Sequence, residues 1–325
     1  MHPLITSNPN ELRKFRAALL RWYTVNHRPL LWRETRDPYC IWVSEVMLQQ
    51  TRVAAVTAYY QRFLDRFPTV QALAAARMSA VLAAWSGLGY YRRARNLHAA
   101  ARQIVADGEM PQSSAALQRL PGVGRYTAAA ISSIAFGEAC AVVDGNVDRV
   151  LARLAGHPHT AAQAWEQAQT MLSSTHPGDF NQAMMELGAT VCLPGEPNCA
   201  RCPVARWCGT RGTLPAQIAA PRIRRRMCLE LRADFDRVLL VKRPATARLM
   251  PDMWELPTIS ARGACGKKPL FRLRHSITVT DYDVLVFAAA GAETKAKWIR
   301  RERLSTLPLT GLTRKILRRA GLMVQ

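Results

Sequence analysis

The sequence predicts a protein of two domains, an all-α domain over residues 1–212 and an α+β domain over residues 228–325. Up to about residue 210, apolar residues recur at three- and four-residue spacing, which is typical of amphipathic helices. Beyond the linker the pattern changes to short runs rich in β-branched residues, which favour strands. The segment between them is rich in proline, glycine and arginine, and we interpret residues 213–227 as a basic linker.

The helical half is a series of periodic segments separated by proline and glycine. In chain order, the predicted helices are RKFRAALLRWYTVN, WVSEVMLQQTRVAAVTAYYQRFLDRF, MSAVLAAWSGL, RRARNLHAAARQIVA, SSAALQRL, a helix starting at Arg125, VDRVLARLAG, AAQAWEQAQTMLSS and DFNQAMMELGATVC. The second half contains the strand-like runs MCLELRADF, RVLLVKR and HSITVTDYDVLVFAA, followed by GLTRKILRRAGL, which we expect to form an amphipathic helix.

The charge of the chain points to a polyanionic partner. Lys and Arg number 45 against 23 Asp and Glu, which gives a net charge of +22. A field of this sign attracts nucleic acid, although a generally basic proteome or an anionic membrane surface are alternatives. We find no apolar stretch long enough to span a membrane and no secretory signal, so we expect a cytoplasmic, nucleoid-associated protein.

Four of the eight cysteines are crowded into 17 residues. Cys192, Cys199, Cys202 and Cys208 have the spacing C-x6-C-x2-C-x5-C, and four thiolates this close can ligate one metal centre. Zinc sites usually use two close pairs, whereas only the middle pair is close here, so we favour a [4Fe–4S] cluster over zinc. Four unrelated cysteines are the remaining alternative. We expect the other four cysteines to be small buried apolar residues.

The stretch LPGVGRYTAAAI predicts a tight turn at the start of a helix. Gly122 and Gly124 allow backbone conformations that other residues avoid, so successive N–H groups can face an anion. The helix N-terminus at Arg125 adds positive charge, which favours a phosphate. We therefore predict a helix–hairpin–helix over residues 113–136 that holds the DNA backbone, against the alternative of a plain connection between two helices.

Several motifs occur in one order along the chain: SEVMLQQT, GLGYYRRARNL, LPGVGRYTAAAI, VVDGNVDRVLAR, FNQAMMELGA and the cysteine loop. Together they resemble the helix–hairpin–helix superfamily of endonuclease III, and within it the MutY-type adenine DNA glycosylases. The resemblance covers about residues 10 to 210 closely and the rest loosely. It implies base excision repair of DNA, with hydrolytic removal of adenine mispaired with 8-oxoguanine or guanine.

The resemblance also implies an architecture and partners. A six-helix barrel over roughly residues 30–140 would carry the hairpin, and an iron–sulfur lobe would be built from residues 1–29 and 141–212. One [4Fe–4S] cluster is implied. The expected partner is double-stranded DNA containing a mispaired adenine, and we expect the protein to act as a monomer and not on a membrane.

Three residues occupy the catalytic positions of the family. Glu45 lies on an apolar helical stripe with Ile41 and Leu48, so lost hydration should raise its pKa and let it act as a general acid, unless its side chain turns to solvent. Asp144 precedes a predicted helix, where an N-cap role alone would keep it charged, and it would stabilise an oxocarbenium sugar. Tyr126 stands where bifunctional relatives have a lysine nucleophile, which predicts a glycosylase without strong lyase activity, unless the ring merely packs the hairpin.

Base flipping requires side chains that replace the extruded base in the duplex. By resemblance, Gln50 and Tyr90 intercalate near 8-oxoguanine, and Gln49 and Thr51 contact the DNA beside them. The hairpin adds further expected DNA contacts, which are Gly122, Val123, Gly124 and Arg125.

The α+β domain resembles a Nudix-type domain at RVLLVKRPATARLMPDMWELP, yet no Nudix box for magnesium follows. It is therefore expected to read the lesion and not to hydrolyse a pyrophosphate. Family members carry a Phe-Ser-His loop there, but this chain has Ile277, Thr278 and Val279, so a ring donor is missing. Two other functions remain open: a glycosylase for another mismatch such as thymine opposite guanine, and a non-catalytic iron–sulfur DNA-binding protein.

Overall fold

The computed structural model describes residues 8–214, 222–260, 264, 266–277, 279–288 and 296–323. The chain divides into two compact units, one formed by Met1–Tyr60 with Ala99–Gln217 and the other by Gln61–His98 with Ile218–Gln325. The predicted residues Thr278 and Cys265, and residues 215–221 of the predicted linker, lie outside the described residues. Within the described part, no helix is both long and apolar enough to cross a membrane.

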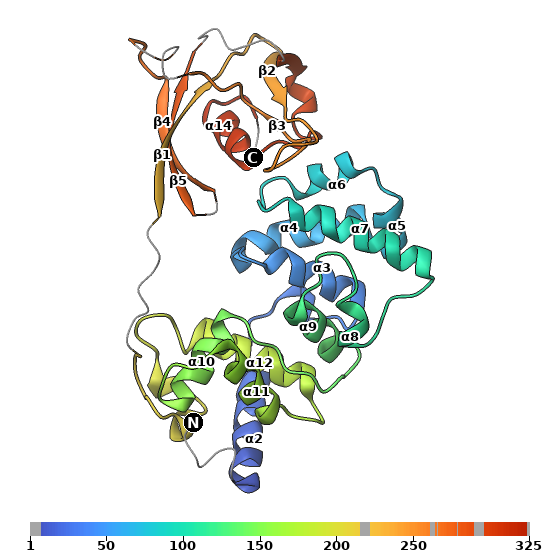
Figure 1. Cartoon of the computed structure of the whole chain (residues 1–325), viewed down its shortest axis with the longest axis vertical. Helices are drawn as coiled ribbons and strands as arrows, with labels where there is room; N and C mark the ends of the chain where they lie inside the picture. The colour runs from blue at the N-terminus through green and yellow to red at the C-terminus, as the bar shows by residue number, and fades with distance from the viewer. Residues whose placement is uncertain are drawn as a thin grey trace. The chain divides into compact units, whose positions relative to one another are not determined.

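The first unit is helical (Figure 1). Its helices are α2 (Pro9–Asn26), α3 (Pro38–Leu48), α8 (Ser114–Leu117), α9 (Arg125–Ala135), α10 (Gly145–Ala155), α11 (Ala161–Met171) and α12 (Pro177–Thr190). One apolar core joins α2, α10, α11 and α12 around Phe15, Leu151, Phe180 and Trp207. The boundaries between the units fall at residues 60/61 within α4 (Val53–Arg66) and at residues 98/99 within α7 (Arg92–Asp107).

The helix that carries Glu45 is buried along nearly its whole length. Asp37 caps α3, because its carboxylate accepts hydrogen bonds from the N–H groups of Tyr39 and Cys40. Every residue from Ile41 to Met47 is buried, so α3 lacks the polar face expected of an amphipathic helix. The run predicted as helical over residues 42–67 is in fact two helices, because the chain turns at Gln49–Arg52 without a proline or glycine to mark the break.

The second unit contains α5 (Val70–Ala75), α6 (Met78–Trp85) and the C-terminal strands. Strands β1 (Ile223–Glu230), β5 (Thr280–Phe287) and β4 (Phe271–Ile277) form one sheet in that order, with β1 parallel and β4 antiparallel to β5. A second sheet has the order β3 (Trp254–Glu255), β2 (Arg237–Lys242), β6 (Ala296–Arg300). The apolar face of α14 (Gly311–Arg319) packs against both sheets through Leu312, Ile316 and Leu317.

Several sequence predictions for the C-terminal half need correction. Strand β1 begins at Ile223, inside the segment interpreted as a linker, because its arginines are exposed at a sheet edge and hide the strand pattern. In the strand-like run that begins at His275, residues 275–277 end β4 and residues 280–287 form β5, which pairs antiparallel with β4. The predicted helix over 113–120 shortens to Ser114–Leu117, and α5, β3 and β6 were not predicted.

Candidate active site

Glu45 is a buried carboxyl group with an incomplete set of hydrogen bonds. The residue is 6% exposed, and its Oε2 atom has no hydrogen-bond partner among the described residues. Burial raises its pKa from 4.5 to about 7, while a hydrogen bond with Tyr126 lowers it, the charge of Asp144 raises it and that of Arg33 lowers it. The direction of this shift agrees with the rise in pKa expected from the sequence.

Tyr126 lies in the first turn of α9 and reaches Glu45. Its hydroxyl donates to the sulfur of Met185 at 3.1 Å, and it also forms a hydrogen bond with Glu45. Because a phenol has one proton, the hydroxyl serves either the Met185 sulfur or an ionised Glu45 at any moment. Burial, then the charges of Glu45 and Asp144, hold the pKa of Tyr126 well above its usual value, so it stays a neutral phenol.

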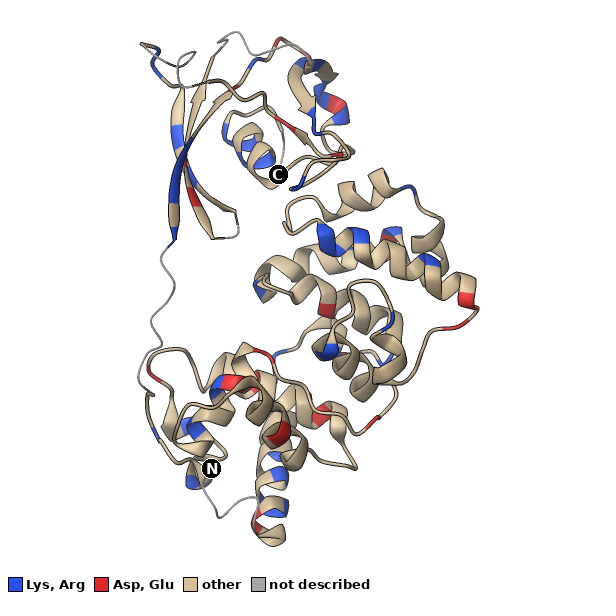
Figure 2. Cartoon of the chain, in the orientation of Figure 1, with Lys and Arg blue, Asp and Glu red and all other residues tan. Residues whose placement is uncertain are grey.

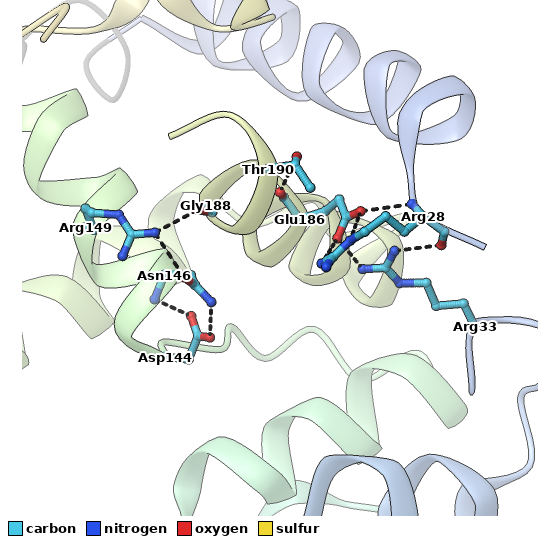
Figure 3. Close-up of polar contacts among 8 residues, drawn as sticks. All are labelled: Arg28, Arg33, Asp144, Asn146, Arg149, Glu186, Gly188 and Thr190. Atoms are coloured by element: carbon cyan, nitrogen blue, oxygen red, sulfur yellow. Dashed lines mark hydrogen bonds and ion pairs between the residues drawn. The ribbon is translucent and has the colours of Figure 1, made fainter. Parts of the chain in front are cut away.

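Asp144 caps helix α10, the role that the sequence offered as the alternative to a catalytic one (Figure 3). Its Oδ1 accepts from the N–H groups of Asn146 at 2.9 Å and Val147 at 2.7 Å. Its Oδ2 accepts from the side-chain amide of Asn146 at 3.1 Å. These three hydrogen bonds fix the orientation of the Asp144 carboxyl group at the start of α10.

Asn146 is held in turn by an arginine (Figure 3). The guanidinium of Arg149 donates to Asn146 Oδ1 at 3.0 Å and to the carbonyl oxygens of Gly188 at 2.7 Å and Cys192 at 2.8 Å. A Cβ atom added at Gly188 would lie 2.7 Å from Cβ of Asn146, so glycine permits this close approach of α12 to α10. A continuous chain of hydrogen bonds therefore links Asp144 to the segment that begins the cysteine loop.

A second buried network holds Arg33, whose charge acts on Glu45. The carboxylate of Glu186 accepts from the guanidinium of Arg28 at 2.8 and 2.7 Å and from Arg33 at 2.8 Å (Figure 3). Burial alone would raise the pKa of Glu186, but these hydrogen bonds outweigh it and lower the pKa to about 2. The site thus contains two buried glutamates, one whose pKa is raised by its surroundings and one whose pKa is lowered.

The hairpin presents backbone donors at the start of α9. Gly122 has φ of +76°, in the left-handed region that favours glycine. Gly124 is the N-cap of α9 and no side chain caps the helix, so its first N–H groups lack an intrahelical acceptor. The Val123 side chain is buried, so this residue can offer a ligand only its backbone. The Arg125 guanidinium lies 3.9 Å from the centre of the Trp165 ring.

All four clustered cysteines line one pocket, which also contains Arg153. The pocket has about 320 Å³ of empty space, including space open to solvent. Arg153 donates to the sulfur of Cys192 at 3.2 Å and to the carbonyl oxygens of Leu193 and Gly195. In the described part of the chain, no group of three or more His, Cys, Asp or Glu side chains is arranged to hold a single metal ion.

Comparisons with known proteins match this arrangement to a family. Residues 43–173 match the HhH-GPD superfamily of base excision DNA repair proteins. The human adenine DNA glycosylase is 49% identical over 218 residues, which are 62% of this chain and 40% of the human protein. The mouse adenine DNA glycosylase is 35% identical over 406 aligned positions, which cover 96% of this chain and 79% of the mouse protein. The chain belongs to the adenine DNA glycosylase family.

Solved structures show the same helical fold. A thermostable thymine-DNA glycosylase superposes with a TM-score of 0.58 at 31% identity, over 62% of this chain and 97% of that one. Endonuclease III in a non-covalent complex with DNA gives a TM-score of 0.54 at 23% identity, over 63% and 96% of the two chains. The chain spans 40% of the human adenine DNA glycosylase and 48% of the Arabidopsis thaliana one.

The residues that family resemblance assigns to intercalation have unusual backbones. Gln50 and Tyr90 have φ of +54° and +47°, which is uncommon for residues with a side chain. Both are exposed. Gln49 is half-buried, and its side-chain amide donates to the hydroxyl of Thr127 on α9 at 3.1 Å. Thr51 is also half-buried, and its hydroxyl bonds the Gln49 carbonyl oxygen at 3.3 Å.

The sequence did not predict the residues that hold the candidate site together. Arg33, Asn146, Arg149, Met185 and Glu186 were not predicted. For Arg149 a signal existed, since it lies three residues after Asn146 on α10, on the same side of the helix. Glu186 gave no such signal, because its partners are more than 150 residues away in the chain.

Proposed function

We propose that this protein is a monofunctional DNA glycosylase that hydrolyses adenine from a mispair with 8-oxoguanine or guanine and leaves an abasic site. The observation that carries the proposal is the pair of carboxyls in the site: the buried Glu45, with a pKa raised to about 7, and Asp144, whose oxygens accept three hydrogen bonds at the start of α10. Hydrolysis of a glycosidic bond uses one carboxyl as an acid and a second carboxyl to stabilise the sugar cation.

Glu45 acts as the general acid. Neutral adenine is a poor leaving group, and protonation at N7 allows its bond to the sugar to break. Burial favours the protonated carboxyl, and Tyr126 orients it by their hydrogen bond. After the base leaves, the ionised Glu45 accepts a proton from the attacking water, which returns the carboxyl to its starting state.

Asp144 stabilises the cationic sugar that forms as adenine departs. Its carboxylate is fixed by the N–H groups of Asn146 and Val147 and by the Asn146 side chain, so it need not reorganise during the reaction. Asp144 is half-buried, and a partly desolvated charge interacts with an oxocarbenium ion more strongly than a charge in bulk water.

Asp144→Asn is expected to lower single-turnover adenine release by about 10²–10³-fold, as loss of one preorganised electrostatic group does. Asparagine is as good an N-cap as aspartate, so α10 should keep its stability. The two effects are separable by measuring cleavage and the thermal midpoint on the same sample. A variant that cleaves normally would remove Asp144 from the mechanism.

Tyr126 supports a monofunctional reaction. Its hydroxyl lies beside Glu45 and cannot form the imine that a lysine forms with the sugar. We infer that strand cleavage at the product requires added alkali. Cleavage without alkali would contradict this part of the proposal.

DNA is held by the hairpin and by distributed positive charge. The unbonded N–H groups at the start of α9 suit one backbone phosphate, and Arg125 lies in the first turn of the same helix. Figure 2 shows Lys and Arg along β1, where Arg224, Arg225 and Arg226 are exposed. By family resemblance, Gln50 and Tyr90 are the proposed intercalating residues, and Gln49 and Thr51 are proposed to contact the DNA.

The cysteine pocket suits a [4Fe–4S] cluster held by Cys192, Cys199, Cys202 and Cys208. Its four sulfur donors line one pocket, and their spacing in the sequence favours a cluster over zinc. Arg153 beside the Cys192 sulfur offers the positive charge that an anionic cluster needs. When bound, the group would cross-link the loop from Cys192 to Cys208 and so fix its conformation.

Cys202→Ser is expected to remove most of the iron and the visible brown colour, because an alcohol is a poor substitute for a thiolate ligand. Iron content and absorbance spectra of the purified protein measure this. Cys228→Ser is the matched control, since Cys228 lies on β1 and not in the pocket, and it should keep full iron content. Stoichiometric zinc without iron in the wild type would overturn the assignment.

The α+β domain is proposed to be a Nudix-like lesion reader without hydrolase activity. The hairpin between β4 and β5 exposes Val279, whose residue exposure is 61%. An apolar side chain there cannot distinguish 8-oxoguanine from guanine by a hydrogen bond. We therefore expect a smaller preference for 8-oxoguanine than a ring donor at this position would give.

Val279→His is expected to raise the preference for adenine opposite 8-oxoguanine over adenine opposite guanine by about 3–10-fold, the value of one added hydrogen bond. The ratio of the two single-turnover rates measures it. Val279→Leu, which adds bulk without a donor, should leave the ratio unchanged. An equal gain in both variants would show that contact area and not hydrogen bonding is involved.

The whole proposal is tested on four duplexes: adenine opposite 8-oxoguanine, adenine opposite guanine, thymine opposite guanine, and adenine opposite thymine. Release of adenine from the first two supports it. The likeness to a thymine-DNA glycosylase at 31% identity favours thymine release as the second candidate. Cleavage of the thymine mispair alone would replace the proposed substrate.

A further inference from the structure

The loop from Ser86 to Tyr91, here called the wedge loop, has a strained backbone. Gly87, Gly89 and Tyr90 have φ of +116°, +72° and +47°. Tyr90 is 44% exposed. A non-glycine residue in this conformation costs free energy and persists only where its surroundings impose it. The contacts that impose it here come from a distant part of the sequence.

Both ends of the wedge loop are bonded to one carbonyl group of the C-terminal domain. The hydroxyl of Ser86 donates to the Leu309 oxygen at 2.6 Å, and the hydroxyl of Tyr91 donates to the same oxygen at 3.0 Å. Ser86 and Tyr91 are 1% and 3% exposed, so neither bond competes with bulk water. A carbonyl oxygen has two lone pairs and can accept both hydroxyls.

Leu309 is a rigid support for this purpose. It is fully buried, between the second sheet and α14. The backbone around it is fixed by hydrogen bonds from Trp254 N–H to the Pro308 oxygen at 2.8 Å and from Thr310 N–H to the Trp254 oxygen at 2.9 Å. Thr310 then caps α14. A shift of Leu309 would thus disturb β3 and the start of α14 together.

Further hydrogen bonds hold the middle of the wedge loop, so the position of Tyr90 depends on the two ends of the loop. The buried Arg93 guanidinium donates to the oxygens of Leu88 and Gly89, each at 3.2 Å. The same guanidinium lies 5.4 Å from the centres of the Tyr90 and Trp85 rings. Arg314 of α14 donates to the Ser86 hydroxyl at 3.1 Å, which adds a second contact from the C-terminal domain.

We infer that Ser86 and Tyr91 are positioning residues, through which the Leu309 carbonyl of the C-terminal domain sets the conformation of Tyr90 for insertion into DNA. This inference rests on the proposed role of Tyr90 as an intercalating residue. It gives the C-terminal domain a second task beside lesion contact: it holds the wedge loop ready, so that less ordering is needed when DNA binds.

A double-mutant cycle in the full-length protein tests the inference. The double variant Ser86→Ala/Tyr91→Phe, here called the brace variant, removes both hydroxyls, and Tyr90→Ser removes the intercalating ring. Adenine release from the 8-oxoguanine duplex is measured in single turnovers. The brace variant should slow release about tenfold in the wild-type background and less than about twofold in the Tyr90→Ser background. Tyr90→Ser alone should slow it by about tenfold or more.

Hydrogen exchange gives a second readout. Amides of residues 87–91 should exchange faster in the brace variant, while those of α9 should not change. Tyr60→Phe is the matched control, because it removes a buried hydroxyl from the Cys40 carbonyl at 3.2 Å and lies outside the wedge loop. It should change neither the exchange of residues 87–91 nor the rate. If the double variant does not fold, Tyr91→Phe alone enters the same cycle with a smaller expected effect.

The outcomes distinguish the positioning role of Ser86 and Tyr91 from the intercalating role proposed for Tyr90. If the brace variant slows release equally in both backgrounds, or does not slow it at all, the positioning role is wrong while Tyr90 keeps its own. If Tyr90→Ser leaves release unchanged, the intercalating role of Tyr90 fails, and the inference fails with it. Only a loss of the brace effect in the Tyr90→Ser background supports both.

Discussion

Glu45→Gln is expected to lower single-turnover adenine release by about 10²–10⁴-fold, the usual contribution of a positioned general acid. Glutamine has nearly the shape of the protonated glutamic acid and can keep a hydrogen bond with Tyr126, but it cannot deliver a proton to the base. Binding to the mismatched duplex should therefore persist, and a binding titration with the variant measures it.

The control for this substitution is Glu166→Gln, which makes the same chemical change at an exposed position on α11. It should cleave at the wild-type rate. Wild-type activity in Glu45→Gln would point instead to a non-catalytic DNA-binding protein, the alternative left open by the sequence. Loss of both binding and cleavage would show that the variant disturbs the site and not only its chemistry.

The pH dependence follows from the same carboxyl. With a pKa of about 7, the acid form of Glu45 decreases as pH rises, so release should slow tenfold per pH unit well above 7. Its raised pKa also means that Glu45 stabilises the fold below pH 4.5 and that this contribution is lost as pH rises to about 7. Relative to the wild type, Glu45→Gln should gain up to about 3 kcal/mol of stability across that range.

Local patterns predicted the parts of the site that depend on nearby residues. The helix start at Arg125 is confirmed, and the N-cap at Asp144, which the sequence offered as the alternative to a catalytic role, is present; each requires only its immediate neighbours. The raised pKa of Glu45 was predictable because seven successive residues of α3 are apolar or small apart from this one. In each case the physical cause acts within one or two helical turns.

Long-range contacts were not predictable in this way. The turn at Gln49–Arg52 has no glycine or proline, and only tertiary packing holds Gln50 at positive φ. The partners of Glu186 come from residues 28 and 33, and the support for the wedge loop comes from Leu309. Hydrogen-bond pairing over such distances leaves no periodic signal in a single sequence.

Glu186→Ala is expected to destabilise the protein by about 3–5 kcal/mol, the cost of leaving a buried charge without its partner. The Glu186 side chain is fully buried and that of Arg33 is 9% exposed, so water cannot replace the lost carboxylate. Chemical denaturation at neutral pH measures the change. Asp179→Ala is the control, because it also removes an acid of α12 from an arginine, Arg36, but at an exposed pair worth about 1 kcal/mol or less.

The same variant should also change catalysis, because Arg33 is shared by the two buried glutamates. Arg33 lowers the pKa of Glu45, and Glu186 partly offsets its charge. Without Glu186, Glu45 faces a less compensated cation, so its pKa should fall and the decline in adenine release should begin at lower pH. Asp179→Ala should leave the pH profile in place. An unchanged pH profile of adenine release in Glu186→Ala would mean that Arg33 moves away when its carboxylate partner is removed. The Glu186 network would then stabilise the fold without affecting the pKa of Glu45.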